Sequence, residues 1–340
     1  MKEILASSPA YRFKQLKQAI FDVRFHSWKE LTSLDKTLRQ KLEEILPYLS
    51  VFNPKIFTSK ADGSQKAILT LSDGEMIETV LMKNSRNQFT ICLSSQVGCA
   101  MGCRFCATGK MGLIRNLTAD EIVDQYRFWL YHLGAPVNDQ NKITNIVIMG
   151  MGEPMANYED IKNSLNDILK YTEVGPTHIT VSTIGLFPIL DKIMADPNWP
   201  NVRLAISLHA PNLAIRKKII PSTPEDYFKK LLVWSKEYLA KFGNRSHYLS
   251  FEYIMINELN DSLAEAKELA ELIKNIGQVK VNLIPCNGAL DPKLKKSQDK
   301  NIRAFSEYLI QNGIRSTVRQ SQGQDIAAAC GQLITKKRPL

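Results

Sequence analysis

The sequence VGCAMGCRFCATG, residues 97–109, places Cys99, Cys103 and Cys106 at C-x3-C-x2-C spacing. Neither a fourth cysteine nor a histidine stands close by, whereas structural zinc sites and ordinary iron–sulfur clusters take four protein ligands. Three thiolates leave one iron of a [4Fe–4S] cluster open to a small molecule, and the flanking glycines let the backbone wrap closely around a bulky group. The motif therefore predicts a [4Fe–4S] cluster. The alternative, three reduced thiols that cluster without a metal, is disfavoured by the tight spacing.

Composition limits the class of protein. The chain has 340 residues with 44% apolar content, enough for one large domain and a smaller one. No apolar run approaches the roughly 20 residues that cross a bilayer, and the N-terminal MKEILASSP lacks the apolar core of a secretion signal. Six cysteines in this length do not make a disulfide scaffold, and the trio needs a reducing compartment. We expect a cytoplasmic protein without a membrane partner.

The charge balance points to an anionic partner. The formal net charge is +10, which favours a polyanion, with nucleic acid as the first candidate. Basic residues concentrate at positions 216–218, 293–296 and 336–338.

Residues 1–87 are predicted to form a small N-terminal α+β accessory domain. Residues 1–50 show apolar spacings near three and four, which indicate short helices. Two Asp-Gly pairs, at positions 62–63 and 73–74, then separate three stretches typical of an antiparallel meander. These stretches are residues 55–60, 66–71 and 76–82.

Strand and helix patterns alternate over residues 88–320, and a C-terminal segment, residues 321–340, follows. The strand-like runs are 89–93, 145–149, 178–182, 203–208, 249–256, 279–284 and 314–318; the helix-like runs are 119–132, 158–171, 224–242, 262–275 and 302–311. Thr118 and Glu121 form a capping box at the first of these helices. This alternation predicts an α/β fold with a parallel sheet and right-handed crossovers, specifically an incomplete (β/α)6 barrel.

Polar or glycine-containing loops follow the predicted strands, where barrels gather their chemistry. They are residues 99–106, 149–154, 181–185, 207–210 and 284–287. Alone, each loop has an ordinary explanation: Gly-Glu-Pro can begin a helix, and His209 can be a satisfied buried histidine. Their shared placement at one barrel mouth favours a single site.

The three-cysteine motif is the signature of radical S-adenosylmethionine (SAM) enzymes, and nearly the whole chain resembles the RlmN/Cfr family of radical-SAM RNA adenine methyltransferases. The most specific stretches are CLSSQVGC, residues 92–99, and GQDIAAACGQL, residues 323–333. The resemblance implies a [4Fe–4S] cluster, two SAM molecules per turnover and a radical-SAM barrel. It implies 23S rRNA, and also tRNA, as partners, with a flavodoxin-like electron donor. The accessory domain is then expected to bind RNA.

The resemblance also gives roles to three residues that residue-level reasoning does not single out. Cys330 resembles the cysteine that is first methylated and then bonds to the adenine ring through a methylene. Cys92 resembles the partner that resolves this adduct by forming a disulfide with Cys330. Glu78 resembles the acceptor of the ring proton. Without the resemblance, Cys92 and Cys330 read as inert core cysteines and Glu78 as a surface residue of the meander.

Further residues resemble the SAM contacts of the family. They are Gly152, Glu153, Ser182, Ser207, Leu208, His209 and Asn287. Cys286 stands where relatives usually carry an aromatic side chain, and residues 320–323 replace a stretch that often holds an arginine.

Several functions compete. Within the family, Gly152-Glu153-Pro154 and Gln96 favour methylation of adenine carbon 2 over the carbon-8 chemistry of Cfr-like antibiotic-resistance members. A radical-SAM enzyme acting on a small molecule or peptide would use Cys92 and Cys330 only structurally. A non-catalytic iron–sulfur RNA-binding protein is disfavoured by the open cluster position and the SAM-contact motifs.

Overall fold

A ten-stranded sheet organises the computed structural model, which describes residues 10–84, 86–134, 142–244, 247–287, 291 and 293–335. Its strand order is β1-β2-β3-β4-β7-β8-β9-β10-β11-β12. Seven of these strands run parallel in chain order: β4 (Phe89–Cys92), β7 (Ile143–Ile148), β8 (Ile179–Thr183), β9 (Arg203–Ser207), β10 (Ser250–Met255), β11 (Lys280–Pro285) and β12 (Arg315–Val318). Sequential parallel neighbours are what strand–helix–strand crossovers produce. The predicted α/β partial barrel is confirmed.

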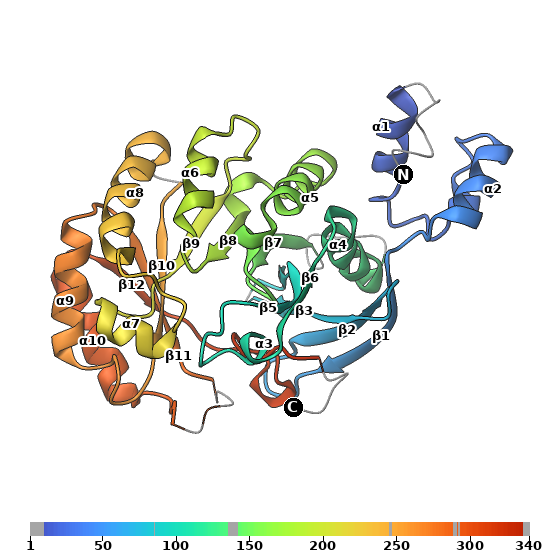
Figure 1. The fold of residues 1–340 in the computed structure, drawn as a ribbon. Coiled ribbons are helices and arrows are strands. Elements are labelled where there is room, and N and C mark those ends of the chain that lie inside the picture. The colour runs from blue at the N-terminus through green and yellow to red at the C-terminus, as the bar shows by residue number, and fades with distance from the viewer. Residues whose placement is uncertain are drawn as a thin grey trace.

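Helices between the parallel strands cover the outer face of the curved sheet (Figure 1). They are α4 (Ala119–Leu133), α5 (Tyr158–Tyr171), α6 (Phe187–Ala195), α7 (Leu213–Ile219), α8 (Tyr227–Phe242), α9 (Leu263–Lys274) and α10 (Asp299–Gln311). The predicted capping box is present: the hydroxyl of Thr118 accepts from the Glu121 amide, and the Glu121 carboxylate accepts from the Thr118 amide. The short helices α6 and α7 were not among the predicted runs.

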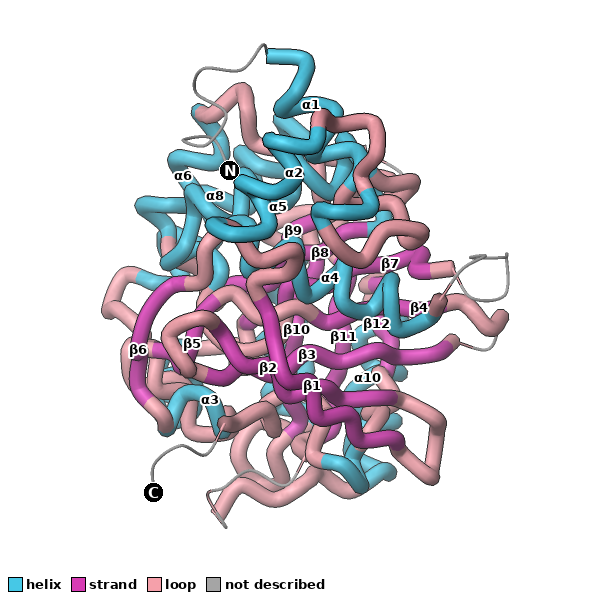
Figure 2. Tube along the Cα trace, turned by 90° about the vertical axis from the view of Figure 1, so that its right-hand side faces the viewer, coloured by secondary structure: helices cyan, strands magenta, loops and turns pink. Residues whose placement is uncertain are grey.

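The N-terminal region begins with two helices, α1 (Ala10–Ala19) and α2 (Lys36–Ile45), and the single-turn helix η1 (Trp28–Glu30). Figure 2 shows α1 and α2 together on one side of the molecule, above the meander strands. Lys17 of α1 is buried and ion-pairs with Asp120 of α4 at 3.1 Å and Asp167 of α5 at 2.8 Å. These contacts attach α1 to the barrel helices.

The predicted meander is present as β1 (Val51–Thr58), β2 (Gln65–Leu71) and β3 (Met76–Lys83). Its last strand pairs antiparallel with β4, and Val80 stands opposite Cys92. The meander of the N-terminal region is therefore continuous with the barrel sheet. The domain boundaries at residues 87 and 320 remain predictions.

The cysteine motif lies on a small hairpin that was not predicted. β5 (Gln96–Cys99) pairs antiparallel with β6 (Gly112–Asn116), and the four-residue helix α3 (Ala107–Lys110) lies between them. Gly98 has a φ of +75°, and a Cβ there would lie 1.9 Å from the Gly112 carbonyl oxygen. Only glycine permits this close approach of the two strands.

None of the helices in the described part of the chain combines the length and the apolar character that a membrane span needs.

Candidate active site

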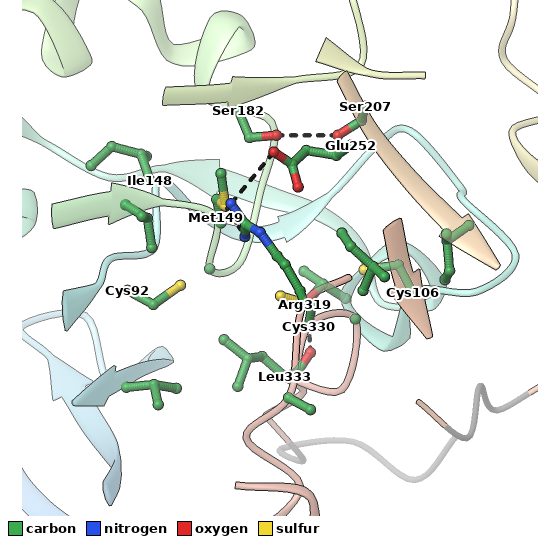
Figure 3. Close-up of a pocket in the computed structure, with 18 of the residues that line it drawn as sticks. Cys92, Cys106, Ile148, Met149, Ser182, Ser207, Glu252, Arg319, Cys330 and Leu333 are labelled. Carbon is green, nitrogen blue, oxygen red and sulfur yellow. Dashed lines mark hydrogen bonds and ion pairs between the residues drawn. The ribbon is translucent and has the colours of Figure 1, made fainter. Parts of the chain in front are cut away.

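A cavity of about 410 Å³ opens at the carboxyl ends of the barrel strands. Figure 3 shows Cys92, Cys106 and Cys330 at its wall, together with residues from several strands. Ten of the predicted site residues line it: Cys92, Cys99, Cys103, Cys106, Gly152, Glu153, Ser182, Ser207, His209 and Cys330. The cavity therefore joins the cysteine trio to the pair of outlying cysteines.

The three clustered thiols surround one part of this cavity. Cys99 ends β5 and Cys106 directly precedes α3, while Cys103 lies in the turn between them. Burial and the neighbouring Cys106 raise the pKa of the Cys99 thiol to about 12, and burial with both neighbours raises that of Cys103 further. A metal would offset this by stabilising the thiolates.

The donor set of this loop fits a cluster. Cysteine thiolates are the ligands that hold iron–sulfur clusters, and three thiols of one loop line the same cavity here. Cys99 and Cys103 are buried and Cys106 is half-buried, so the group that they would hold is partly shielded from solvent. Cys99, Cys103 and Cys106 are thus the candidate holders of a [4Fe–4S] cluster.

The loop after β7 lies directly on the start of the cysteine hairpin. A Cβ on Gly150 would lie 2.8 Å from the Leu93 carbonyl oxygen, and one on Gly152 would lie 2.6 Å from the Gln96 Cβ. The Met151 carbonyl accepts from Ser95 and Gln96, and the Gln96 side chain accepts from the Glu153 amide at 2.8 Å. The glycines are therefore required for packing, and Gln96 fixes the loop that carries Glu153.

Glu153 is buried, and both of its carboxylate oxygens already have partners. Oε1 accepts from the Met155 amide at 3.0 Å, and Oε2 accepts from the Ile184 amide at 2.9 Å. Burial is the main cause that raises its pKa, while these hydrogen bonds and one from Thr183 oppose the shift. The carboxylate therefore ties the loops after β7 and β8 together beside the cysteine trio.

His209 is held in one tautomer. Its Nδ1 accepts from the Ile254 amide at 3.1 Å, which places the ring proton on Nε2. Burial and the nearby charge of Arg216 lower its pKa to about 3, so the ring is neutral. It packs edge-on against Phe105 of the cysteine loop, with ring centroids 4.8 Å apart. The sequence-level alternative of a satisfied buried histidine describes its contacts, although the ring also lines the cavity.

Arg216 begins the basic run at residues 216–218, but its charge is not available to an anionic partner at the surface. It is fully buried, stacks on the Tyr227 ring at 3.8 Å, and donates to the carbonyls of Ile184, Ser207 and Leu208. It also interacts electrostatically with Cys103. The sequence does not reveal this buried role, because an arginine within a basic run looks like one whose charge is exposed to water. The run at 336–338 lies outside the described residues.

Cys92 and Cys330 approach the cavity from opposite ends of the chain. Burial, together with the neighbouring Cys330, raises the pKa of the Cys92 thiol to about 12. Solvent reaches Cys330, yet the protein around it raises the pKa of its thiol too. Arg319, just after β12, opposes the shift at both thiols and donates to Met149 Sδ at 3.7 Å. The two thiols are free, and they share one cation.

The C-terminal segment that carries Cys330 is attached to the cysteine loop. The Gly331 carbonyl accepts from the Ala107 amide at 2.7 Å, and the Leu333 carbonyl accepts from the Thr108 hydroxyl at 2.6 Å. Asn287 donates to the Cys330 carbonyl at 3.5 Å. Cys330 is thereby held near Cys106, which contributes electrostatically to its pKa.

The other three predicted residues do not line the cavity. Leu208 is buried and positions the chain through its backbone, whereas Asn287 contacts the C-terminal segment. Glu78 is 1% exposed, so its reading as a surface residue is wrong. It lies on the same face of β3 as Val80, which does line the cavity. Cys286 is buried in an apolar cluster with Cys103 and donates weakly to the Leu294 carbonyl.

This architecture defines a radical SAM enzyme: a parallel partial barrel, three cysteines on the loop after its first strand, and a glycine-glutamate loop after the second. The sequence model of the radical SAM superfamily matches residues 93–273, which include all three cysteines. The protein is therefore a member of that superfamily, whose cofactors are a [4Fe–4S] cluster and SAM.

Full-length relatives narrow the class. The chain is 42% identical, over 96% of its length and 90% of the relative's, to a probable dual-specificity RNA methyltransferase RlmN of Dictyoglomus turgidum. It is 37% identical, over 95% of its length and 84% of the relative's, to the dual-specificity RNA methyltransferase RlmN of Alcanivorax borkumensis. A radical SAM methyltransferase from Sphaerobacter thermophilus superposes with a TM-score of 0.88 at 38% identity, covering 98% of this chain and 96% of that one. The chain belongs to the RlmN family.

Proposed function

We propose that this radical SAM methyltransferase methylates carbon 2 of an adenine in the peptidyl-transferase region of 23S rRNA and, next to the anticodon, in tRNA. The observation that carries this proposal is the shared cavity, in which the cluster cysteines and the outlying pair Cys92 and Cys330 meet. Two further free thiols beside the cysteine trio suit a methyl transfer that passes through sulfur and ends in a disulfide. The names of the relatives support an RNA substrate.

Cys330 is proposed to receive the methyl group and to carry it as a methylene to the adenine ring. When bound, the cluster and SAM supply the methyl group and the carbon radical that this transfer needs, because an aromatic adenine carbon is a poor nucleophile. The Cys92 thiolate then attacks the Cys330 sulfur and forms a disulfide. The bond from that sulfur to the product carbon breaks, and its electron pair goes to the carbon, which takes up a proton to become the methyl group. Arg319 supports this step electrostatically, since it favours the thiolate form of Cys92.

Glu78 is proposed to accept the proton from the ring. Burial raises its pKa, which makes the carboxylate a better base than an exposed one. Its Oε1 pairs with Lys66 at 3.0 Å and its Oε2 accepts from the Ile334 amide at 2.9 Å. Each oxygen has one of these partners and keeps a second lone pair, so the carboxylate can still accept a proton.

The carbon-8 reaction of Cfr-like members is the alternative within the family. Gly152-Glu153-Pro154 and Gln96 favour carbon 2, and Gln96 is the residue that fixes the Glu153 loop.

The proposed partners further include a flavodoxin-like electron donor, and the proposed compartment is the cytoplasm.

Analysis of the product tests this proposal. The anaerobically reconstituted protein would be incubated with SAM, a reductant and either a 23S rRNA fragment or tRNA, followed by nuclease digestion and mass spectrometry against 2-methyl- and 8-methyladenosine standards. We expect 2-methyladenosine from both RNAs and none with Cys330→Ala. Formation of 8-methyladenosine would contradict the carbon-2 assignment, and product from rRNA alone would remove tRNA as a substrate.

A further inference from the structure

Four polar side chains form a row across the inside of strands β9 to β12. Ser207 stands beside Glu252, Glu252 beside Asn282, and Asn282 beside Thr317 in the strand register. Since register partners on neighbouring strands point to the same face, the four side chains lie in line. The row ends at Ser207, whose hydroxyl lies 3.2 Å from that of Ser182.

Within this row, Glu252 uses only one of its two carboxylate oxygens. Oε1 accepts from Asn282 Nδ2 at 2.7 Å, and Arg319 Nη2 lies 3.5 Å from the same oxygen. Asn282 is fixed in turn by the Thr317 hydroxyl, which donates to its Oδ1 at 2.7 Å. Oε2 is buried and has no hydrogen-bond partner among the described residues.

The unpartnered oxygen belongs to the cavity. Glu252 lines the cavity although the residue is only 3% exposed. Figure 3 shows it next to Ser182 and Ser207, with Arg319 on its other side. A buried carboxylate oxygen without a donor is costly, so it marks a place where a bound molecule is expected to donate.

We propose that Glu252 accepts a hydrogen bond from a ribose hydroxyl of an adenosine bound in the cavity. A carboxylate is an acceptor only, and it is a common partner of ribose hydroxyls in nucleotide sites. The neighbouring serines add further hydroxyl partners on the same side. SAM is the source of this ribose, because Ser182 and Ser207 belong to its proposed site. This inference rests on the proposed function and assigns a residue to that site.

The contact can be tested without turnover by a thermodynamic cycle, in which the ligand hydroxyl and the Glu252 carboxylate are removed separately and together. S-adenosylhomocysteine has no methyl group to transfer, so its affinity and those of its 2′-deoxy and 3′-deoxy analogues can be measured anaerobically on cluster-loaded protein. Loss of the critical hydroxyl should weaken binding to the parent about tenfold, as expected for a hydrogen bond to a charged group. Glu252→Met should bind S-adenosylhomocysteine about tenfold more weakly and no longer distinguish it from that analogue.

Two variants control the cycle. Thr317→Val removes the far end of the row and should keep the discrimination of the parent. Glu252→Gln, which is uncharged but can still donate to a hydroxyl, should fall between the parent and Glu252→Met. Equal affinity of the parent and Glu252→Met for the deoxy analogue would show that the variant is folded.

The source of the ribose is tested with RNA that carries 2′-deoxyadenosine at the target. If the coupling with Glu252 appears there and not with the S-adenosylhomocysteine series, the contact is made to the substrate nucleotide. Tight S-adenosylhomocysteine binding with no coupling in either series would overturn this inference alone. Failure of the parent to bind S-adenosylhomocysteine would overturn the proposed function as well.

Discussion

Lys66 and Glu78 form a buried ion pair across strands β2 and β3, with 3.0 Å between Nζ and Oε1. The same ammonium donates to the Ala327 carbonyl at 3.2 Å, and the same carboxylate accepts from Ile334. The pair is thus bonded twice to the segment that carries Cys330. The proposed base is therefore linked to the segment of the proposed methyl carrier both directly and through this lysine.

Replacement of Lys66 by methionine should therefore affect both stability and Cys330. Removing one partner leaves a buried carboxylate uncompensated, and we expect the free energy of unfolding at pH 7 to fall by about 3–5 kcal/mol. Loss of the Ala327 contact should also speed alkylation of Cys330, followed by mass spectrometry. The double variant Lys66→Met/Glu78→Gln should recover most of the stability of the parent, but Cys330 should still be alkylated faster than in the parent. If the double variant does not recover the stability either, the loss in Lys66→Met comes from the packing of the lysine and not from an unpaired carboxylate.

The pH dependence of stability should report on Glu78. Its pKa is raised in the folded protein above the ordinary value of 4.5, so the folded state binds this proton more tightly than the unfolded state does. The stabilisation that the protonated Glu78 contributes is complete below pH 4.5 and is lost as the pH rises through the pKa of the folded protein. Relative to Glu78→Gln, the parent should lose stability over that window by at most about 1.4 kcal/mol per pH unit. If the parent instead gains stability relative to Glu78→Gln as the pH rises, the pKa of Glu78 is not raised in the folded protein.

Arg216 should be essential to the barrel mouth. Its guanidinium donates to the carbonyls of Ile184, in the loop after β8, of Ser207, at the end of β9, and of Leu208, directly after it. Arg216→Met leaves these carbonyls without that donor and should lower the free energy of unfolding by about 3 kcal/mol or more. Arg216→Lys should recover only part of this loss, because an ammonium cannot stack flat on Tyr227. Denaturant titration of both variants measures the effect, and full stability of the methionine variant would contradict it.

Sequence patterns predicted the barrel well because each strand and helix carries its own periodicity. Helix α5 was predicted at its observed bounds, residues 158–171, since its apolar face repeats regularly and a polar loop precedes it. The hairpin of β5 and β6 was missed because its strands are short and their spacing is dictated by the cysteine loop. The pairing of β3 with β4 was also missed, although only residues 84–88 separate the two strands, because the domain boundary was predicted between them, at residue 87.

The site likewise combines residues that local motifs predict with residues that only the fold identifies. The three cysteines and the Gly152-Glu153 loop were predicted from local motifs, and the structure brings them to one cavity. Arg216 and Glu252 were not predicted, because what distinguishes them is burial, and a charged residue in a sequence gives no sign of being buried. Gln96 was noted only as a family marker, and its hydrogen bond to the Glu153 amide depends on the fold.

Iron content should separate the cluster cysteines from the other buried cysteine near them. Replacing Cys99, Cys103 or Cys106 by alanine should lower bound iron well below the roughly four per chain expected of a [4Fe–4S] cluster and abolish SAM cleavage. Cys286→Ala is the matched control, because Cys286 packs in the same apolar cluster as Cys103 without lining the cavity. It should retain its iron. Equal loss in all four variants would mean that packing, and not ligation, explains the effect.

The two outlying cysteines should fail in different ways if their proposed roles are correct. Cys330→Ala has no sulfur to accept the methyl group, so it should form neither methylated protein nor product. Cys92→Ala should still load the methyl group and bond to the ring, then stop as a covalent protein–RNA adduct, because the second thiol at the cavity wall is missing. The adduct should migrate slowly on a denaturing gel and disappear after nuclease digestion.

Cys286→Ala also serves as the control here, since it removes a buried thiol that does not line the cavity. It should turn over without trapping RNA. A Cys92→Ala protein that is free of RNA and as active as the parent would exclude the disulfide step. Cys92 would then serve only to pack β4 against β3, where it stands opposite Val80.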